Sequence, residues 1–126
     1  MRFKKSWKSS KSPKKQRKYR HYAPLHIKRK FIAAHLSKEL RKKYNKRSAS
    51  IRKGDKVKIL RGNFKGKTGT IERVELKKEK CYITGIEVIK MDGTKRLQPI
   101  RPSNLLITAL NLDDKKRKSS LERKND

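Results

Sequence analysis

The first 50 residues of the chain are so basic that they leave little material for a hydrophobic core. They hold 19 lysines and arginines and one acidic residue, Glu39, for a formal charge of +18. The whole 126-residue chain carries +29, from 40 basic and 11 acidic residues. Like charges destabilise a compact chain, and solubility needs only roughly 2–8 net charges. The excess therefore predicts a polyanionic partner, most simply a phosphate backbone whose counterions are released on binding.

The apolar residues are distributed the other way, and they divide the chain into three segments. Residues 1–50 form a basic extension, residues 51–111 hold most of the isoleucine, leucine and valine, and residues 112–126 form a charged tail. We expect residues 1–20 to be disordered in the free chain, because they show no apolar periodicity. The tail should be weakly helical at most.

Two short helices are predicted within the basic extension. The first spans residues 25–34 and follows Pro24, with apolar side chains on one face at Leu25, Ile27, Phe31 and Ile32. Ser37 can cap the second, whose apolar positions are Leu36, Leu40 and Tyr44. Helices this short are marginal in water, so we expect them to be ordered only against RNA or the rest of the fold.

From residue 51 the pattern is that of short strands, over residues 56–60, 68–76, 81–89, 95–100 and 105–110. A slip in phase between Ile71 and Val74 predicts a β-bulge, and Asp92-Gly93 is a strong hairpin signal. Residues 101–104 should form one tight helical turn. Five short strands at this spacing predict a mainly β fold, a small antiparallel barrel preceded by the two helices.

A glycine-rich loop joins the first two strands and is the most informative motif. Gly62, Gly66 and Gly69 permit a tight turn and close approach of a phosphate to the main chain. The loop also carries cations and an aromatic ring that could stack on a base or sugar. Gly54 and Gly69 are better explained by the turn itself, whereas Lys65 and Lys67 are better explained by contact with RNA.

Basic and aromatic residues alternate in the extension, which holds six of the eight aromatic residues of the chain. This pattern suits RNA, because cations bind phosphates while rings stack on exposed bases. Phe31 and Tyr44 are better explained as packing residues. The candidate RNA-binding residues are Lys14, Lys15, Arg17, Lys18, Tyr19, Arg20, Tyr22, Lys28, Arg29, Lys30, Arg61, Gly62, Asn63, Phe64, Lys65, Gly66 and Lys67.

The loop resembles the KOW motif of small SH3-like barrels in translation and transcription proteins, through the spacing of Gly54-Asp55, Gly62, Lys65-Gly66 and Gly69. The segments on either side of the loop narrow this resemblance to one family. Residues 13–18, 23–26, 36–44, 102–105 and 112–114 are similar to the universal large-subunit ribosomal protein twenty-four family, in its archaeal and eukaryotic branch (protein twenty-six in eukaryotes). The short C-terminus looks archaeal, and residues 1–12 match less clearly.

This resemblance implies a structural constituent of the large ribosomal subunit in the cytoplasm. It implies binding to large-subunit (23S-type) rRNA early in assembly. It also implies a position near the polypeptide exit tunnel, beside other large-subunit proteins.

The sequence offers no recognisable catalytic or metal-binding pattern. His21, His26 and His35 lack the spacing of a zinc site. Cys81 alternates with Ile83 and is better explained as a buried small apolar residue than as a nucleophile. We therefore expect no enzyme activity, cofactor, metal or small-molecule substrate. No apolar run approaches the ~18 residues of a membrane span, so no membrane partner is expected.

Two other functions remain open on the residues alone. One is a KOW module of a transcription elongation factor that contacts RNA polymerase, although the chain has no room for the α/β domain usually joined to it. The other is a nucleoid or cationic membrane-active protein, whose binding would be indifferent to RNA structure and would weaken steeply with salt.

Overall fold

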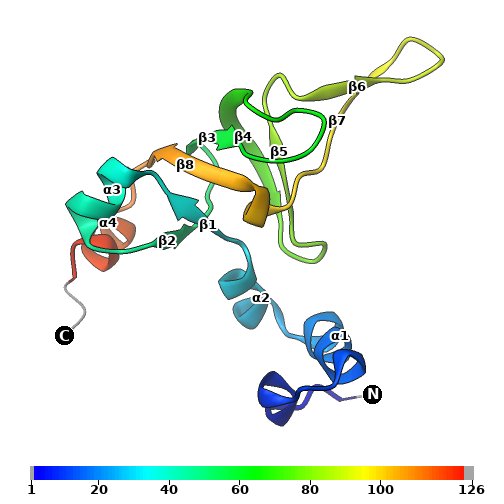
Figure 1. The fold of residues 1–126 in the computed structure, drawn as a ribbon, viewed down its shortest axis with the longest axis vertical. Coiled ribbons are helices and arrows are strands. Elements are labelled where there is room, and N and C mark those ends of the chain that lie inside the picture. Colours follow the sequence, from blue (N-terminus) through cyan, green and yellow to red (C-terminus); the bar gives the residue numbers. More distant parts are fainter. Residues whose placement is uncertain (1, 124–126) are drawn as a thin grey trace.

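The computed structural model describes residues 2–123. Figure 1 shows a helical arm at the N-terminus, a twisted sheet in the middle of the molecule, and a hairpin that projects from the sheet. No helix within residues 2–123 has the length and apolar character needed to cross a membrane.

The start of the arm is helical. It contains the 3₁₀ helix η1 (Lys5–Ser9) and helix α1 (Pro13–Tyr22), so the prediction of disorder over the first 20 residues is wrong for this structure. Pro13 occupies the first turn of α1, where its missing N–H costs nothing. The side-chain amide of Gln16 donates to three main-chain carbonyls, those of Trp7, Lys8 and Ser10. These hydrogen bonds join η1 to α1. The apolar pattern of the sequence could not predict them, because the groups that form them are polar.

The two helices predicted for the extension are confirmed as α2 (Leu25–Phe31) and α3 (Lys38–Tyr44). The Ser37 hydroxyl caps α3 by accepting from the main-chain N–H of Leu40 at 3.4 Å. The helix ends at Asn45, which adopts the left-handed conformation with φ of 52°. Helix α2 ends earlier than predicted, because residues 33–36 form a strand.

Six strands form one sheet in the order β2–β1–β8–β3–β4–β5. Strand β1 lies parallel to β8, and every other pair in this sheet is antiparallel. Because β1 and β2 precede residue 51, the sheet-forming part of the chain begins before the change in charge at residue 50. The strands are β1 (Ala33–Leu36), β2 (Ser48–Ser50), β3 (Lys56–Ile59), β4 (Thr68–Glu75), β5 (Lys80–Ile83) and β8 (Leu105–Ala109).

The strand pairings of the described residues leave the sheet open, with β2 and β5 at its edges. The closed barrel expected from strand spacing is therefore not confirmed. Cys81 and Ile100 exchange two main-chain hydrogen bonds of 2.9 Å. These bonds join β5 to the segment that leads through the 3₁₀ helix η2 (Pro102–Asn104), the predicted helical turn, into β8.

The β3–β4 hairpin and its glycines follow the sequence prediction. The register of β4 against β5 shifts between Ile71 and Arg73, which confirms the bulge. A Cβ atom at Gly69 would lie 2.5 Å from Ile83 Cγ2 and 2.9 Å from the Thr84 carbonyl oxygen. Gly54 has a φ of +91°, and a Cβ there would lie 2.5 Å from Asn111 Nδ2. Both glycines therefore serve backbone conformation and packing.

The strand predicted over residues 81–89 is divided in two. Gly85, with a φ of +84°, breaks it, and β6 (Glu87–Ile89) pairs only with β7 (Lys95–Leu97) in a separate two-stranded ribbon. The predicted turn at Asp92-Gly93 is confirmed. The Thr94 hydroxyl and N–H both donate to the Asp92 carboxylate, and these bonds lower the pKa of that carboxyl.

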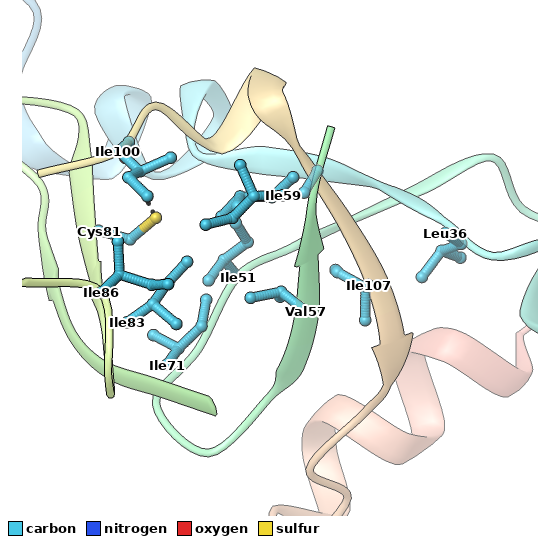
Figure 2. Packing of buried hydrophobic residues seen from close by; sticks show 12 residues of the cluster. Leu36, Ile51, Val57, Ile59, Ile71, Cys81, Ile83, Ile86, Ile100 and Ile107 are labelled. Carbon is cyan, nitrogen blue, oxygen red and sulfur yellow. Dashed lines mark hydrogen bonds between the residues drawn. The ribbon is translucent and has the colours of Figure 1, made fainter. Parts of the chain in front are cut away.

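The core is a single cluster of buried aliphatic side chains, most of them isoleucines (Figure 2). Cys81 belongs to it, fully buried, and its thiol donates to the Ile100 carbonyl at 3.2 Å. Its prediction as a buried small apolar residue is confirmed. The cluster consists of Ala34, Leu36, Ile51, Val57, Ile59, Ile71, Cys81, Ile83, Ile86, Ile100, Leu105 and Ile107.

The tail forms helix α4 (Lys115–Glu122), which was expected to be weakly helical at most. Asp114 caps it by accepting from the N–H of Lys116 at 3.0 Å. Arg52 also donates to the Asp114 carboxylate, and this hydrogen bond lowers the pKa of the carboxyl. Arg117 reaches into the body and pairs with buried Asp55. The helical character of the tail was underestimated because an ion pair between residues distant in sequence cannot be seen in the local pattern of apolar residues.

Candidate nucleic-acid interface

The glycine-rich loop between β3 and β4 is a compact turn with an exposed rim of cations. The N–H of Gly66 donates to the Ile59 carbonyl at 2.8 Å and the N–H of Lys67 donates to the Phe64 carbonyl at 3.1 Å. Gly62 and Gly66 have φ of +99° and +86°, and a Cβ at either would meet open space. Their role is therefore the backbone conformation of the turn. Arg61, Gly62, Asn63, Lys65, Gly66 and Lys67 are all exposed, as predicted for a loop that contacts RNA.

Phe64 is the exception in this loop. It is partly buried and packs against the core cluster. The Lys67 ammonium lies 5.1 Å from the ring centroid, which is a cation–π distance. The ring thus has a packing role, and only its uncovered part is available to a ligand.

Helix α1 presents an array of cations. Lys14, Lys15 and Arg17 are exposed, and Lys18 is half-buried. No acidic residue lies in the first turn of this helix. Arg20 is exposed but engaged, because its guanidinium lies 3.5 Å from the Glu79 carboxylate and 5.2 Å from the centre of the Phe31 ring. The helix therefore keeps a dense positive face directed away from its packing contacts.

The two tyrosines predicted to stack on bases differ in exposure. Tyr19 is 8% exposed and lies between Phe3 and Phe31, at ring-centroid distances of 5.3 and 5.8 Å. Its ring is a packing residue and not the stacking platform that was predicted. Tyr22 is 37% exposed and its ring is in edge contact with His21, so it remains a candidate for stacking. Phe31 and Tyr44 pack, as expected: Phe31 is half-buried and Tyr44 is buried.

The three consecutive basic residues of α2 also differ in exposure. Arg29 and Lys30 are exposed, whereas Lys28 is buried and donates from Nζ to the Lys77 carbonyl at 3.0 Å. Lys28 therefore fastens the arm to the turn between β4 and β5, in place of the RNA contact that was predicted. The Arg20–Glu79 pair reaches the same turn. The candidate residues thus form two groups, one on the arm and one on the glycine-rich loop.

A cleft of about 240 Å³ lies beside the glycine-rich loop. Its second wall comes from β5 and from residues 98–104, and it contributes further polar and basic side chains, among them Lys80, Gln98, Arg101 and Asn104. Sequence analysis missed these four residues, because they are scattered over 25 positions with no local motif. The hydrogen bonds between Cys81 and Ile100 bring them next to the loop.

The described residues contain no cluster of three or more histidine, cysteine, aspartate or glutamate side chains able to hold a metal ion. Burial raises the pKa of the Cys81 thiol to about 12, which keeps it protonated and poorly nucleophilic. The exposed polar side chains of the arm and loop are mainly cations, which suits binding of an anion.

A family model described as "Ribosomal proteins L26 eukaryotic, L24P archaeal" matches residues 10–124. The chain belongs to this family of ribosomal proteins. The match begins close to residue 12, where the resemblance seen in the sequence also weakens. All candidate residues, from Lys14 to Lys67, lie inside the matched range.

Curated members of the ribosomal family are similar over nearly their whole length. The large ribosomal subunit protein uL24 of Methanocella arvoryzae is 48% identical over 116 residues, covering 92% of this chain and 94% of the relative. The proteins of the same name from Methanosphaera stadtmanae and Methanothrix thermoacetophila are 46% and 47% identical. These alignments cover 91% and 90% of this chain, and 98% of each relative.

Proposed function

We propose that the chain is a structural constituent of the large ribosomal subunit that binds large-subunit rRNA through its arm and its glycine-rich loop. The observation that carries this proposal is the distribution of unpaired charge. Lys14, Lys15 and Arg17 on α1 and Lys65 on the loop are exposed and take part in no ion pair within residues 2–123. Membership in a ribosomal family supplies the polyanion that would neutralise them.

The arm and the loop would do different work. The arm has few packing contacts of its own, and Tyr19 is the only buried residue of α1. It would bind phosphates along its exposed cations. The loop is held by main-chain hydrogen bonds on the sheet, and it would dock as a preformed surface. We propose three functional parts on this basis: the basic extension over 1–50, a KOW SH3-like unit over 51–111 and the charged tail over 112–126.

We infer that β3, β4, β5 and β8 form the SH3-like unit of a KOW domain. The order of these strands, the bulge in β4 and η2 before β8 support this assignment. The bonds between Cys81 and Ile100 would replace the strand pairing that closes such a barrel.

The family resemblance supplies the cellular setting. The protein would join the large subunit early in assembly, in the cytoplasm. It would lie near the polypeptide exit tunnel, in contact with neighbouring large-subunit proteins. Protein–RNA cross-linking in purified subunits, followed by sequencing of the linked RNA, tests this position.

A competition experiment tests RNA binding itself. The full chain is bound to labelled large-subunit rRNA, and unlabelled rRNA or duplex DNA is added at a fixed salt concentration. Charge alone binds both polymers and weakens steeply with salt, whereas a shaped RNA site keeps a preference for rRNA. A chain that shows no rRNA preference at physiological salt would contradict the proposal and favour a nucleoid-type protein.

A further inference from the structure

The cleft beside the glycine-rich loop, called here the loop cleft, is walled on one side by Arg61, Asn63 and Phe64. On the other side are Lys80, Gln98 and Arg101, with Asn104 at the end of η2. Residues up to 43 positions apart in the chain thus meet around one concavity. The glycine-rich loop and the bonds between Cys81 and Ile100 hold its two walls in place.

Three cations face this cleft and none is neutralised by the protein. Arg61, Lys80 and Arg101 form no ion pair and no side-chain hydrogen bond with any other residue of the described chain. The lining contains no aspartate or glutamate. Three unpaired cations around one small space favour an anionic ligand, and guanidinium groups match the geometry of phosphate.

Three side-chain amides share the lining, those of Asn63, Gln98 and Asn104. Each amide can donate and accept hydrogen bonds, and none of the three has a side-chain partner among residues 2–123. Amides with both capacities suit the edge of a nucleobase, which also offers donors and acceptors. A carboxylate ligand would need the cations alone.

Size and shape restrict the ligand further. The volume of about 240 Å³ lies below the roughly 300–1,000 Å³ of sites that enclose drug-sized ligands. It therefore fits a single base with its phosphate and excludes a duplex. The part of the Phe64 ring that faces the cleft offers a stacking surface.

We propose that the loop cleft binds one unstacked nucleotide of single-stranded rRNA, with its phosphate on Arg61, Lys80 and Arg101 and its base against Phe64 and the three amides. This inference rests on the proposed function, because it identifies the RNA element that the loop would contact. It goes further in assigning the second wall of the cleft to binding.

NMR spectroscopy of the full chain with short RNA probes tests the inference. The probes are a single-stranded RNA hexamer of mixed sequence and an RNA hairpin closed by a non-nucleotide linker, so that every nucleotide of the hairpin is paired; the two are compared at equal phosphate concentration. The reporters are the side-chain amide signals of Asn63, Gln98 and Asn104. We expect the hexamer to shift all three signals and to give contacts between its protons and the Phe64 ring, and the hairpin to shift none of them.

A matched pair of variants separates the cleft from general electrostatic attraction. Arg101→Gln removes a cation from the cleft, whereas Arg47→Gln removes an exposed cation beside β2, at the opposite edge of the sheet. Arg101→Gln should weaken hexamer binding about tenfold and Arg47→Gln should weaken it far less. Lys80→Gln is the second cleft variant, and unchanged thermal unfolding shows that each variant is folded.

The possible results are distinct. Equal weakening by Arg101→Gln and Arg47→Gln, with unmoved amide signals, would overturn the cleft proposal while leaving RNA binding by the arm intact. Larger amide shifts with the hairpin would overturn the single-nucleotide assignment. Equal shifts with a glutamate-rich peptide would reassign the cleft to acidic protein segments. Failure of the full chain to bind any RNA would instead contradict the proposed function itself.

Discussion

Arg117 on α4 and Asp55 before β3, 62 positions apart, form a buried bidentate ion pair with two hydrogen bonds of 2.7 Å. The Asp55 side chain is fully buried, and it also accepts from the main-chain N–H groups of Arg52 and Asn111. Arg117 in turn donates to the Ser50 and Asn111 carbonyls. The pair therefore ties the C-terminal helix to the start of β3.

Removing one partner of this pair should strongly destabilise the fold. Arg117→Met leaves the Asp55 charge buried without its partner, which typically costs about 3–5 kcal/mol. Denaturant unfolding measures the change. The control is Arg52→Gln, which breaks the exposed pair with Asp114 and should cost about 1 kcal/mol or less. Equal losses of unfolding free energy in the two variants would show that burial does not determine how much an ion pair contributes to stability.

Gly69 is fixed by close packing. Gly69→Ala would place a Cβ 2.5 Å from Ile83 Cγ2, and overpacking of this kind costs about 1–3 kcal/mol. Thr68→Ala, at the exposed neighbouring position of β4, should change the free energy of unfolding by no more than about 0.5 kcal/mol. Thermal or denaturant unfolding of both variants makes the comparison. A Gly69→Ala protein as stable as the Thr68→Ala protein would mean that β4 and β5 can separate at this point.

The reactivity of Cys81 should depend on unfolding. Burial raises the pKa of its thiol from 9.0 to about 12. The folded state therefore favours the protonated thiol, and this contribution to stability is complete below pH 9 and is lost as pH rises toward 12. Between pH 7 and 9 a thiol reagent should modify the folded chain far more slowly than the unfolded chain, because a pKa three units higher leaves about a thousandfold less thiolate at a given pH. The rate should still rise about tenfold per pH unit in both states, since both pKa values lie at or above this range. Rapid labelling at pH 8 without denaturant would contradict the buried position.

The arm should account for much of the salt dependence of RNA binding. Replacing Lys14, Lys15 and Arg17 with glutamine should reduce the slope of log affinity against log salt by about two to three, if each cation contacts a phosphate. The matched control replaces Lys115, Lys116 and Lys118 on α4, with the same loss of charge. Filter binding to rRNA over a range of salt concentrations measures both. A similar loss of slope in the control would mean that binding follows total charge and not the arm.

Local patterns predicted the elements that depend on neighbouring residues. The cap at Ser37, the bulge after Ile71 and the Asp92-Gly93 turn are of this kind, and each is present. Strands β1 and β2 were missed because they are short, and β1 pairs with β8 about 70 residues later. Helix α4 was underestimated because Arg117 is held by a residue distant in sequence.

The candidate site shows the same limit. Exposure of the loop cations follows from the glycines, which force a turn at the surface. The burial of Tyr19 and Lys28 depends on Phe3, Phe31 and the Lys77 carbonyl. The second wall of the loop cleft depends on the pairing of Cys81 with Ile100. Local composition cannot predict contacts between residues that lie this far apart in the sequence.

Sedimentation of a cell extract tests the central claim most directly. The protein is followed through a sucrose gradient by quantitative mass spectrometry, with and without dissociation of the ribosomal subunits. The account predicts that it travels with the large subunit in near-equal proportion to other large-subunit proteins, and that ribonuclease releases it. Recovery with RNA polymerase, or in the free fraction of an intact extract, would contradict it.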